Sequence, residues 1–204
     1  MPTEISKLVL GTHNRKKRLE LECLLAPMGI RLCSLADYPH ALTVEETGET
    51  FIENARLKAC QQAIHLQEWT IGEDSGLCVP LLGGQPGVYS ARYAGPQATD
   101  EDNNAKLLSA LQNASDERRN AYYISTIALS DPHGAIHLEA EGRCWGRILT
   151  AGRGTSGFGY DPLFEIPEYH QTFAELGLAV KAVLSHRARA LEKFLRGLRD
   201  LLAK

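Results

Sequence analysis

Glu73, Asp74 and Ser75 stand together between two glycines, in the stretch Gly72–Gly76. Two adjacent carboxylates and a hydroxyl form a compact cluster of hard oxygen ligands. Mg²⁺ prefers such ligands and leaves the rest of its octahedron to water and phosphate. Residues that favour β-structure lie on both sides, so we expect a strand that breaks at an acidic turn. An exposed acidic turn without function is the alternative interpretation of this stretch taken alone.

A run of four cations, Arg15–Arg18, opens a helix that we expect to begin after Gly11–Asn14 and to end near Leu25. The positive end of a helix favours acidic side chains, so these cations break a local rule. We interpret the run as an anion site, where free N–H groups and ammonium groups converge at the helix N-terminus. Pairing of Lys16 and Arg18 with glutamates four positions later is the alternative, in the weaker order for such pairs. The sequence has no Walker A pattern, GxxxxGK[ST].

A second helix is predicted after the acidic segment Glu45–Glu49, because Thr50 and Glu53 have the spacing of a capping box. Apolar residues with helical spacing mark its buried face: Phe51, Ile52, Ala55, Ala59, Cys60, Ala63 and Ile64. Asn54 and Lys58, four positions apart, share another face. Such a pair is usually solvated surface. In the alternative interpretation, the acidic segment supplies a second metal ligand and Lys58 faces the same anion.

The stretch Gly152–Gly157 matches GxGxxG, but it does not predict a dinucleotide site. That fingerprint must lead directly into a helix, whereas Phe158–Phe164 contains a glycine and a proline and is closely followed by Pro167. We therefore expect a flexible loop around an exposed aromatic, in which Phe158 or Tyr160 stacks on a base. A glycine-rich turn with buried aromatics is the alternative.

Ser185, His186 and Arg187 open the predicted C-terminal helix, shortly after Lys181. Ser185 is a natural N-cap. The apolar positions that follow have helical spacing: Ala188, Leu191, Phe194, Leu195, Leu198 and Leu202. His186 and Arg187 fall in the first turn, so cations again stand at the disfavoured end of a helix.

The remaining elements follow from hydrophobic pattern and turn residues. Strands are expected at Leu8–Leu10, Ile30–Leu35, Ala121–Ser130, Ala135–Arg143 and Trp145–Leu149, with an extended segment at Val88–Tyr93. The strands before and after Asp131–Gly134 form a hairpin, and Thr99 with Asp102 caps a further helix. His133 and His137 are interpreted as turn and strand residues, because no partner stands at metal-site spacing.

The composition excludes several classes of protein. With 204 residues, 44% hydrophobic and 23% charged, the chain is typical of a globular protein with one compact unit. A net charge of −3 argues against a nucleic-acid partner bound through a broad basic surface. The five cysteines form no CxxC pair, so we expect reduced core residues of a cytoplasmic protein. No apolar run is long enough to span a membrane, so no membrane partner is expected.

Seven motifs, in order along nearly the whole chain, resemble those of the inosine triphosphate pyrophosphatase family, which hydrolyses non-standard purine nucleoside triphosphates. The matching motifs are Thr12-His13-Asn14-(x2)-Lys17, Glu45-Glu46-Thr47-Gly48, Phe51-Ile52-Glu53-Asn54-Ala55, Asp74-Ser75-Gly76-Leu77, Pro86-Gly87-Val88-Tyr89-Ser90-Ala91-Arg92-Tyr93, Gly157-Phe158-Gly159-Tyr160-Asp161-Pro162 and Ser185-His186-Arg187. Three positions depart from the family's pattern. His13 replaces a glycine, Glu73 replaces a common aspartate, and Ala182 stands where a polar residue is frequent.

The resemblance implies an α/β fold with a long mixed β-sheet and flanking helices that form two lobes around a substrate cleft, in a homodimer. It implies that Asp74 is the general base and, together with Glu45, a ligand of a Mg²⁺ cofactor. The residues implied in nucleotide binding are Thr12, His13, Asn14, Arg15, Lys16, Lys17 and Lys181 for phosphates, Phe158, Gly159, Tyr160, Asp161, His186 and Arg187 for the purine, and Ser75. The reaction that the resemblance implies is attack of water on the α-phosphorus, which gives the monophosphate and pyrophosphate.

Two other functions stay open at this point. One is a related house-cleaning pyrophosphatase for modified pyrimidine nucleotides. His186, Arg187 and the loop with Phe158-Gly159-Tyr160, which we call the aromatic loop, favour purines. The other is a nucleotide sensor without turnover, although a binder gains little from a metal-linked base such as Asp74. Lys58, from its position on the second helix, joins the expected substrate-binding residues.

Overall fold

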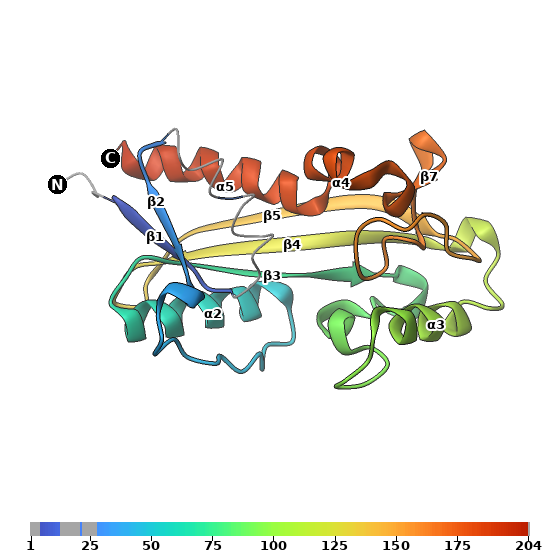
Figure 1. Cartoon of the computed structure of the whole chain (residues 1–204), viewed down its shortest axis with the longest axis horizontal. Helices are drawn as coiled ribbons and strands as arrows, with labels where there is room; N and C mark the ends of the chain where they lie inside the picture. Colours follow the sequence, from blue (N-terminus) through green and yellow to red (C-terminus); the bar gives the residue numbers. More distant parts are fainter. Residues whose placement is uncertain (1–4, 13–20, 22–27, 204) are drawn as a thin grey trace. The chain divides into compact units, whose positions relative to one another are not determined.

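The computed structural model describes residues 5–12, 21 and 28–203. Within these ranges the chain forms a seven-stranded β-sheet with the strand order β2-β1-β3-β4-β5-β6-β7, flanked by helices (Figure 1). The sheet is mixed, because β1 pairs in parallel with β2 and β3 whereas β6 is antiparallel to β5 and β7. The predicted α/β fold, with a long mixed sheet and flanking helices, is confirmed.

The described elements follow one another in the order that Figure 1 colours along the chain. The strands are β1 (Lys7–Leu10), β2 (Arg31–Ser34), β3 (Thr70–Cys78), β4 (Asn120–Ser130), β5 (Ile136–Ile148), β6 (Phe164–Ile166) and β7 (Gln171–Thr172). The α-helices are α2 (Phe51–Leu66), α3 (Asp100–Ala110), α4 (Phe173–Leu184) and α5 (His186–Leu202). Short 3-10 helices include η4 (Gly87–Arg92) and η6 (Pro167–Tyr169).

The chain divides into two compact units, and each has its own hydrophobic core. Unit 1 takes its described residues from Met1–Asp74, Thr126–Glu141 and Ala190–Lys204, and unit 2 consists of Ser75–Ser125 and Gly142–Arg189. In unit 1 the apolar face of α5 is buried as predicted: Ala190, Leu191, Phe194, Leu195 and Leu198 pack with Leu8, Leu10, Ile71 and Ile127. Burying each large apolar side chain stabilises the unit by about 1.5–3 kcal/mol.

The core of unit 2 is centred on aromatic rings. The Tyr123 ring on β4 lies 4.6 Å from that of Phe164 on β6, and Phe164 stacks on Phe173 of α4 at 5.4 Å. Leu107 and Leu111, predicted to face inward from the capped helix α3, are fully buried in the same cluster. Unit 2 therefore joins helix and sheet through one cluster that combines residues far apart in the sequence.

The capping boxes predicted from the sequence are confirmed at both sites. Thr50 with Glu53 caps α2, and Thr99 with Asp102 caps α3. Ser185 accepts a hydrogen bond from the backbone N–H of Ala188 (3.2 Å), which makes it the N-cap of α5. Of the helix expected to end near Leu25, only Leu21 is described, and it is helical and buried. The short strands β6 and β7 and the helix α4 were not predicted.

β3 runs without interruption, so the predicted acidic turn is wrong. Gly72 marks a close approach of two elements rather than a break, because a Cβ there would lie 2.0 Å from the backbone carbonyl oxygen of Ala55 on α2. Glycine thus lets the helix pack against the strand. As a result Glu73 and Asp74 lie on a buried strand and are only 7% and 8% exposed.

The segment Val88–Tyr93, predicted as extended, instead lies in and just after the 3-10 helix η4. Ser90 favours this conformation, since its hydroxyl lies 2.6 Å from the carbonyl oxygen of Gly87 and accepts from the backbone N–H of Leu77 (2.9 Å). A side-chain hydroxyl that bonds to the neighbouring backbone competes with strand pairing. The expectation of an extended segment is therefore wrong, because the hydrogen bonds of the Ser90 hydroxyl favour the 3-10 helix.

β4 and β5 form the predicted hairpin, closed by Asp131. The Asp131 carboxylate accepts from the backbone N–H groups of His133 (2.9 Å) and Ala135 (3.0 Å) and lies 2.8 Å from His137 Nε2. β5 continues through Trp145, so the additional strand expected there is the second half of β5. The two histidines are turn and strand residues, as predicted.

The described cysteines are free thiols. Cys33, Cys78 and Cys144 are buried, which agrees with the prediction of reduced core residues, whereas Cys60 is only half-buried. Burial raises the pKa of the Cys144 thiol to about 11. Cys23 lies outside the described residues. In the part of the chain that the structure describes, no helix is long and apolar enough to cross a membrane.

Candidate active site

Asp74 lies on β3 in unit 1 and is paired with α2. Its Oδ1 accepts a hydrogen bond from the ammonium group of Lys58 (2.9 Å), and its Oδ2 accepts from the amide of Asn54 (3.4 Å). The backbone carbonyl of Asp74 accepts from the hydroxyl of Thr126 on β4 (3.3 Å). The carboxylate is thus fixed at both oxygens and through its own backbone.

Asn54 and Lys58 share one face of α2, as the four-residue spacing predicted. That face is not solvated surface, since Asn54 is fully buried and the Lys58 side chain is 13% exposed. Asn54 also accepts from the backbone N–H of Gly48 (2.8 Å), which ties the acidic segment before α2 to the helix. Lys58 completes the link, because its ammonium lies 3.3 Å from a carboxylate oxygen of Glu46. We call Glu46, Asn54, Lys58 and Asp74 the carboxylate cluster.

The electrostatics of the carboxylate cluster favour a proton acceptor. Burial raises the pKa of the Asp74 carboxyl above its ordinary value, and the nearby Glu46 carboxylate raises it further. The Lys58 ammonium and the Asn54 amide act in the opposite direction. Two carboxylates thus share one ammonium, which leaves an excess of negative charge in this cluster.

The donors of the carboxylate cluster fit Mg²⁺. Among the described residues no three His, Cys, Asp or Glu side chains gather into a complete metal site. Mg²⁺ does not require one, because it usually takes one or two carboxylates and fills its octahedron with water and substrate phosphate. The excess negative charge of Asp74 and Glu46 beside Lys58 suits such a cation.

Glu45, the implied second ligand, is exposed, and its backbone carbonyl accepts from the N–H of Thr47 (3.1 Å). It is Glu46 whose carboxylate reaches Lys58, and the two adjacent glutamates gave no signal for choosing between them. The assignment of Glu45 stays a prediction.

Of the predicted phosphate-binding loop, only its start is described. The backbone N–H of Gly11 donates to the carbonyl of Ile71 on β3 (2.7 Å), and Thr12 follows directly. Its first residues therefore leave β1 beside the strand that carries Asp74. His13, Asn14, Arg15, Lys16 and Lys17 lie outside the described residues, so their roles stay predictions.

In unit 2 two of the predicted nucleotide-binding residues, Phe158 and Lys181, contact Asp161. This carboxylate is fully buried and accepts from the Lys181 ammonium and from the backbone N–H of Phe158 (3.1 Å). The hydroxyl of Tyr123 lies 3.4 Å from its other oxygen. Residues from β4, the aromatic loop and α4 thus meet at one buried charge.

Aromatic rings lie close to the pair of Lys181 and Asp161. The Lys181 ammonium lies 4.2 Å from the centre of the Phe158 ring, and the His186 ring stacks on Tyr123 at 4.8 Å and 15°. Phe158 is 45% exposed, whereas Tyr160 is buried and donates its hydroxyl to the backbone carbonyl of Ser90 (2.8 Å). Of the two aromatics proposed for stacking, only Phe158 therefore offers a ring face. We call Tyr123, Phe158, Asp161, Lys181 and His186 the aromatic cluster.

The structure also places three other predicted site residues, whose roles stay predictions. Lys181, expected to bind phosphate, is 7% exposed and paired with Asp161 inside the aromatic cluster. Arg187, expected to bind the purine, is 8% exposed at the start of α5. Ser75 is half-buried on β3. Tyr123, which joins the aromatic cluster, had no sequence signal because it has the pattern of an ordinary strand residue.

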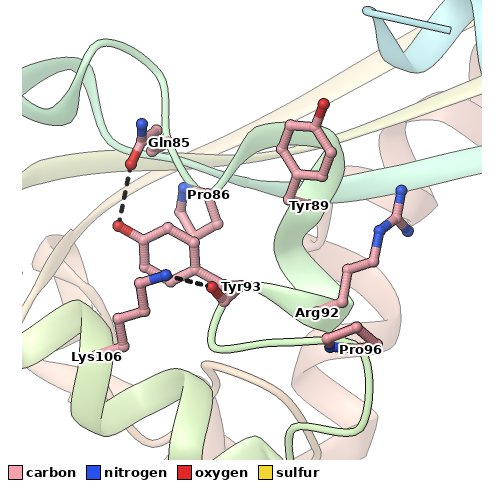
Figure 2. A pocket seen from close by; sticks show the side chains of 7 residues that line it. All are labelled: Gln85, Pro86, Tyr89, Arg92, Tyr93, Pro96 and Lys106. Carbon is pink, nitrogen blue, oxygen red and sulfur yellow. Dashed lines mark hydrogen bonds between the residues drawn. The ribbon is translucent and has the colours of Figure 1, made fainter. Parts of the chain in front are cut away.

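The motif Pro86–Tyr93 forms a pocket of about 310 Å³ in unit 2 (Figure 2). The lining residues are Gln85, Pro86, Tyr89, Arg92, Tyr93, Pro96 and Lys106. The Tyr93 hydroxyl bonds to Gln85 (3.2 Å), and the Lys106 ammonium donates to the Tyr93 carbonyl (2.5 Å). The Arg92 guanidinium lies 5.3 Å from the Tyr89 ring centre. The hydrogen bonds give this motif a structural role in shaping the surface of unit 2.

Comparisons with known proteins agree with the motifs. The model of the Ham1 family matches residues 8–197. The dITP/XTP pyrophosphatase of Rhodopirellula baltica is 53% identical over 188 residues, which cover 92% of this chain and 90% of the relative. That of Thermus thermophilus is 48% identical over 195 residues, 95% of this chain and 92% of the relative.

Solved structures agree as well. A HAM1 protein from Coxiella burnetii is 37% identical, with a TM-score of 0.91 over 96% of this chain and 100% of its own. A nucleoside-triphosphatase / dITP/XTP pyrophosphatase from Mycobacterium abscessus is 40% identical, with a TM-score of 0.79 over 91% of this chain and 96% of its own. The family resemblance drawn from the motifs is confirmed, and the chain belongs to the Ham1 family.

Proposed function

We propose that this chain is a Mg²⁺-dependent nucleoside triphosphate pyrophosphatase that hydrolyses the non-standard purine nucleotides ITP, dITP and XTP to the monophosphate and pyrophosphate. The relatives named dITP/XTP pyrophosphatase support this substrate class. The observation that carries the proposal is the buried Asp74 carboxylate, held by Lys58 and Asn54 beside a second carboxylate.

Asp74 acts as the general base. Its raised pKa makes it a better proton acceptor than an ordinary carboxylate, while Lys58 limits the rise and favours the ionised form. Asp74 orients a water molecule and accepts its proton as the water oxygen bonds to the α-phosphorus. The bond between the α-phosphorus and the oxygen that bridges to the β-phosphorus breaks, and pyrophosphate leaves with that oxygen.

The carboxylate cluster also holds the metal in this proposal. Asp74, with Glu46 or Glu45, supplies the carboxylate oxygens. A bound Mg²⁺ neutralises charge on the phosphate oxygens. The cationic segment Arg15–Arg18 and the residues Thr12–Asn14 hold the phosphates, which are anions suited to a helix N-terminus.

The aromatic cluster and Arg187 recognise the base. The exposed face of Phe158 stacks on the purine, and Arg187 and His186 donate hydrogen bonds to the oxygen at position 6 of hypoxanthine or xanthine. Adenine presents an amino donor at that position, so these donors would be left unpaired. Sites of this kind discriminate by up to about 10⁴–10⁵-fold.

We further propose that the chain acts on the nucleotide pool of the cytoplasm and works as a homodimer. Sedimentation would measure the oligomeric state.

A nucleotide panel tests the function. Purified protein is incubated with ITP, dITP, XTP, ATP, GTP and a modified pyrimidine triphosphate, with Mg²⁺ or with EDTA. Products are identified by ³¹P NMR. We expect monophosphate and pyrophosphate from the first three nucleotides, at least about tenfold faster than from ATP, and no turnover in EDTA.

Each rival function predicts a different result from the same panel. Preference for the pyrimidine would establish the related house-cleaning enzyme. Tight binding of ITP without product would establish a sensor. Release of inorganic phosphate alone would mean attack at the terminal phosphate and would exclude the proposed reaction.

A further inference from the structure

Gly159, beside the exposed Phe158, is held at both of its backbone polar groups by one helix. Its N–H donates to the Asp100 carboxylate (2.6 Å), and its carbonyl accepts from the side-chain amide of Asn104 (3.0 Å). Asp100 and Asn104 stand four positions apart on α3 and therefore lie on one face of it. A single helical face thus binds a single residue of the aromatic loop.

The loop needs such support because its own backbone is permissive. Gly157 and Gly159 adopt positive φ angles of 87° and 62°, a region that glycine enters without strain and leaves as readily. The Phe158 ring is 45% exposed, so packing holds it only in part. Besides the Lys181 ammonium near its ring, the backbone holds Phe158: its own N–H donates to Asp161, and the next residue is bound by α3.

α3 is a firm support for this contact. The Thr99–Asp102 capping box fixes its start, and Leu107 on its inner face is fully buried. Asn103, 2% exposed, accepts from the backbone N–H of Ala94 (2.8 Å) and anchors the helix to the preceding segment. A contact from α3 therefore fixes the loop relative to the unit 2 core.

We propose that Asp100 and Asn104 are positioning residues for base recognition, which hold the Gly159 peptide so that Phe158 presents its ring to the purine. This inference rests on the proposed function. The Asp100 bond is the stronger of the two, since a carboxylate accepts from a peptide N–H in a charge-assisted hydrogen bond. Neither side chain needs to touch the reacting phosphate, so their effect falls on binding and base choice rather than on the chemical step.

The test compares Asp100→Ala and Asn104→Ala with Asp100→Asn, which keeps an acceptor oxygen, and with Asp102→Ala. The last is the matched control: the Asp102 carboxylate accepts from the backbone N–H of Thr99 (2.9 Å) in the cap of the same helix. Its loss weakens α3 without removing a contact to the loop. Amide exchange of Gly159, followed by NMR in the protein without nucleotide, reports on the contact directly.

We expect Gly159 exchange to accelerate about tenfold or more in Asp100→Ala. It should accelerate less in Asp100→Asn, which keeps the acceptor oxygen but loses its charge, and stay near the wild-type rate in Asp102→Ala. With dITP, KM rises about five- to tenfold in Asp100→Ala and Asn104→Ala, while kcat changes less than about threefold. Asp102→Ala lowers the melting temperature and leaves KM unchanged.

Unchanged Gly159 exchange in Asp100→Ala overturns the inference. So does an equal rise of KM in Asp102→Ala, because that result would trace the effect to helix stability. If wild-type protein turns over no nucleotide, the proposed function fails. In that case Gly159 exchange still decides the contact, and the dissociation constant of dITP takes the place of KM as the measure of purine binding.

Discussion

Replacing Lys181 by methionine tests how the aromatic cluster of unit 2 is held together. The substitution keeps the apolar stem of the side chain but removes the ammonium that faces Asp161, a carboxylate with no solvent exposure. Removing one partner of a buried ion pair costs about 3–5 kcal/mol. Two donors to Asp161 remain, the Phe158 backbone N–H and the Tyr123 hydroxyl. We therefore expect a loss near the lower limit, about 3 kcal/mol.

The free energy of unfolding is measured by urea titration for Lys181→Met, Asp161→Asn and the double variant. In a protein of this size about 3 kcal/mol corresponds to a fall of roughly 6–12 °C in melting temperature. The double variant carries an uncharged amide in place of the Asp161 carboxylate, so it should be more stable than Lys181→Met. Lys193→Met is the control. Its ammonium donates to the backbone carbonyl of Glu141 at the surface (2.7 Å), and its loss should cost no more than about 0.5 kcal/mol.

Two results would refute this reasoning. A loss in Lys181→Met as small as in Lys193→Met would mean that the pair does not stabilise unit 2. Strictly additive effects in the double variant would mean that Lys181 and Asp161 do not interact. Either result would mean that the Lys181–Asp161 pair does not hold the aromatic cluster together.

Two further predictions concern unit 1. In Lys58→Met, the pKa of Asp74 should rise further, because Lys58 lowers it in the native cluster. A base with a higher pKa is already protonated at a higher pH, so the acidic limb of the kcat/KM profile should move to higher pH. A carboxyl ¹³C titration without metal checks the direction, and a fall in the pKa would contradict it. Gly72→Ala should destabilise the fold by about 1–3 kcal/mol, because the new Cβ meets the Ala55 carbonyl at 2.0 Å. Gly152→Ala, whose nearest contact is 3.5 Å away, should stay within about 0.5 kcal/mol of wild type in the same urea titration.

Local signals in the sequence were sufficient for much of the fold. The capping boxes at Thr50 and Thr99 depend on residues three positions apart, so they could be predicted directly and are confirmed. The α5 face follows from helical periodicity alone. By contrast, Gly72 was interpreted as a strand breaker, although it allows contact with a helix that begins some twenty residues earlier. A pattern of residues along the chain does not show which distant element a glycine contacts.

In the candidate site, too, features that depend on local sequence signals could be predicted, and features that depend on tertiary packing could not. The residue types of the carboxylate cluster were predictable, and helical spacing alone placed Asn54 and Lys58 on one face of α2. Which glutamate reaches Lys58 depends on the path of an irregular segment, so Glu46 was not distinguished from Glu45. The pairing of Lys181 with Asp161 joins α4 to a loop, and no local rule distinguishes such a lysine from one that binds phosphate. Tyr123 entered the cluster only through the packing of β4.

The most direct test of the account is the rate of pyrophosphate release from dITP by Asp74→Asn, at saturating dITP and Mg²⁺. Asparagine has the shape of aspartate but cannot accept the water proton. Burial already disfavours the ionised carboxylate, so the fold should tolerate the change. The account predicts a fall in kcat of at least about 10²–10⁴-fold with a melting temperature near that of wild type. A kcat within about threefold of wild type would contradict the role of Asp74 as general base and, with it, the proposed mechanism.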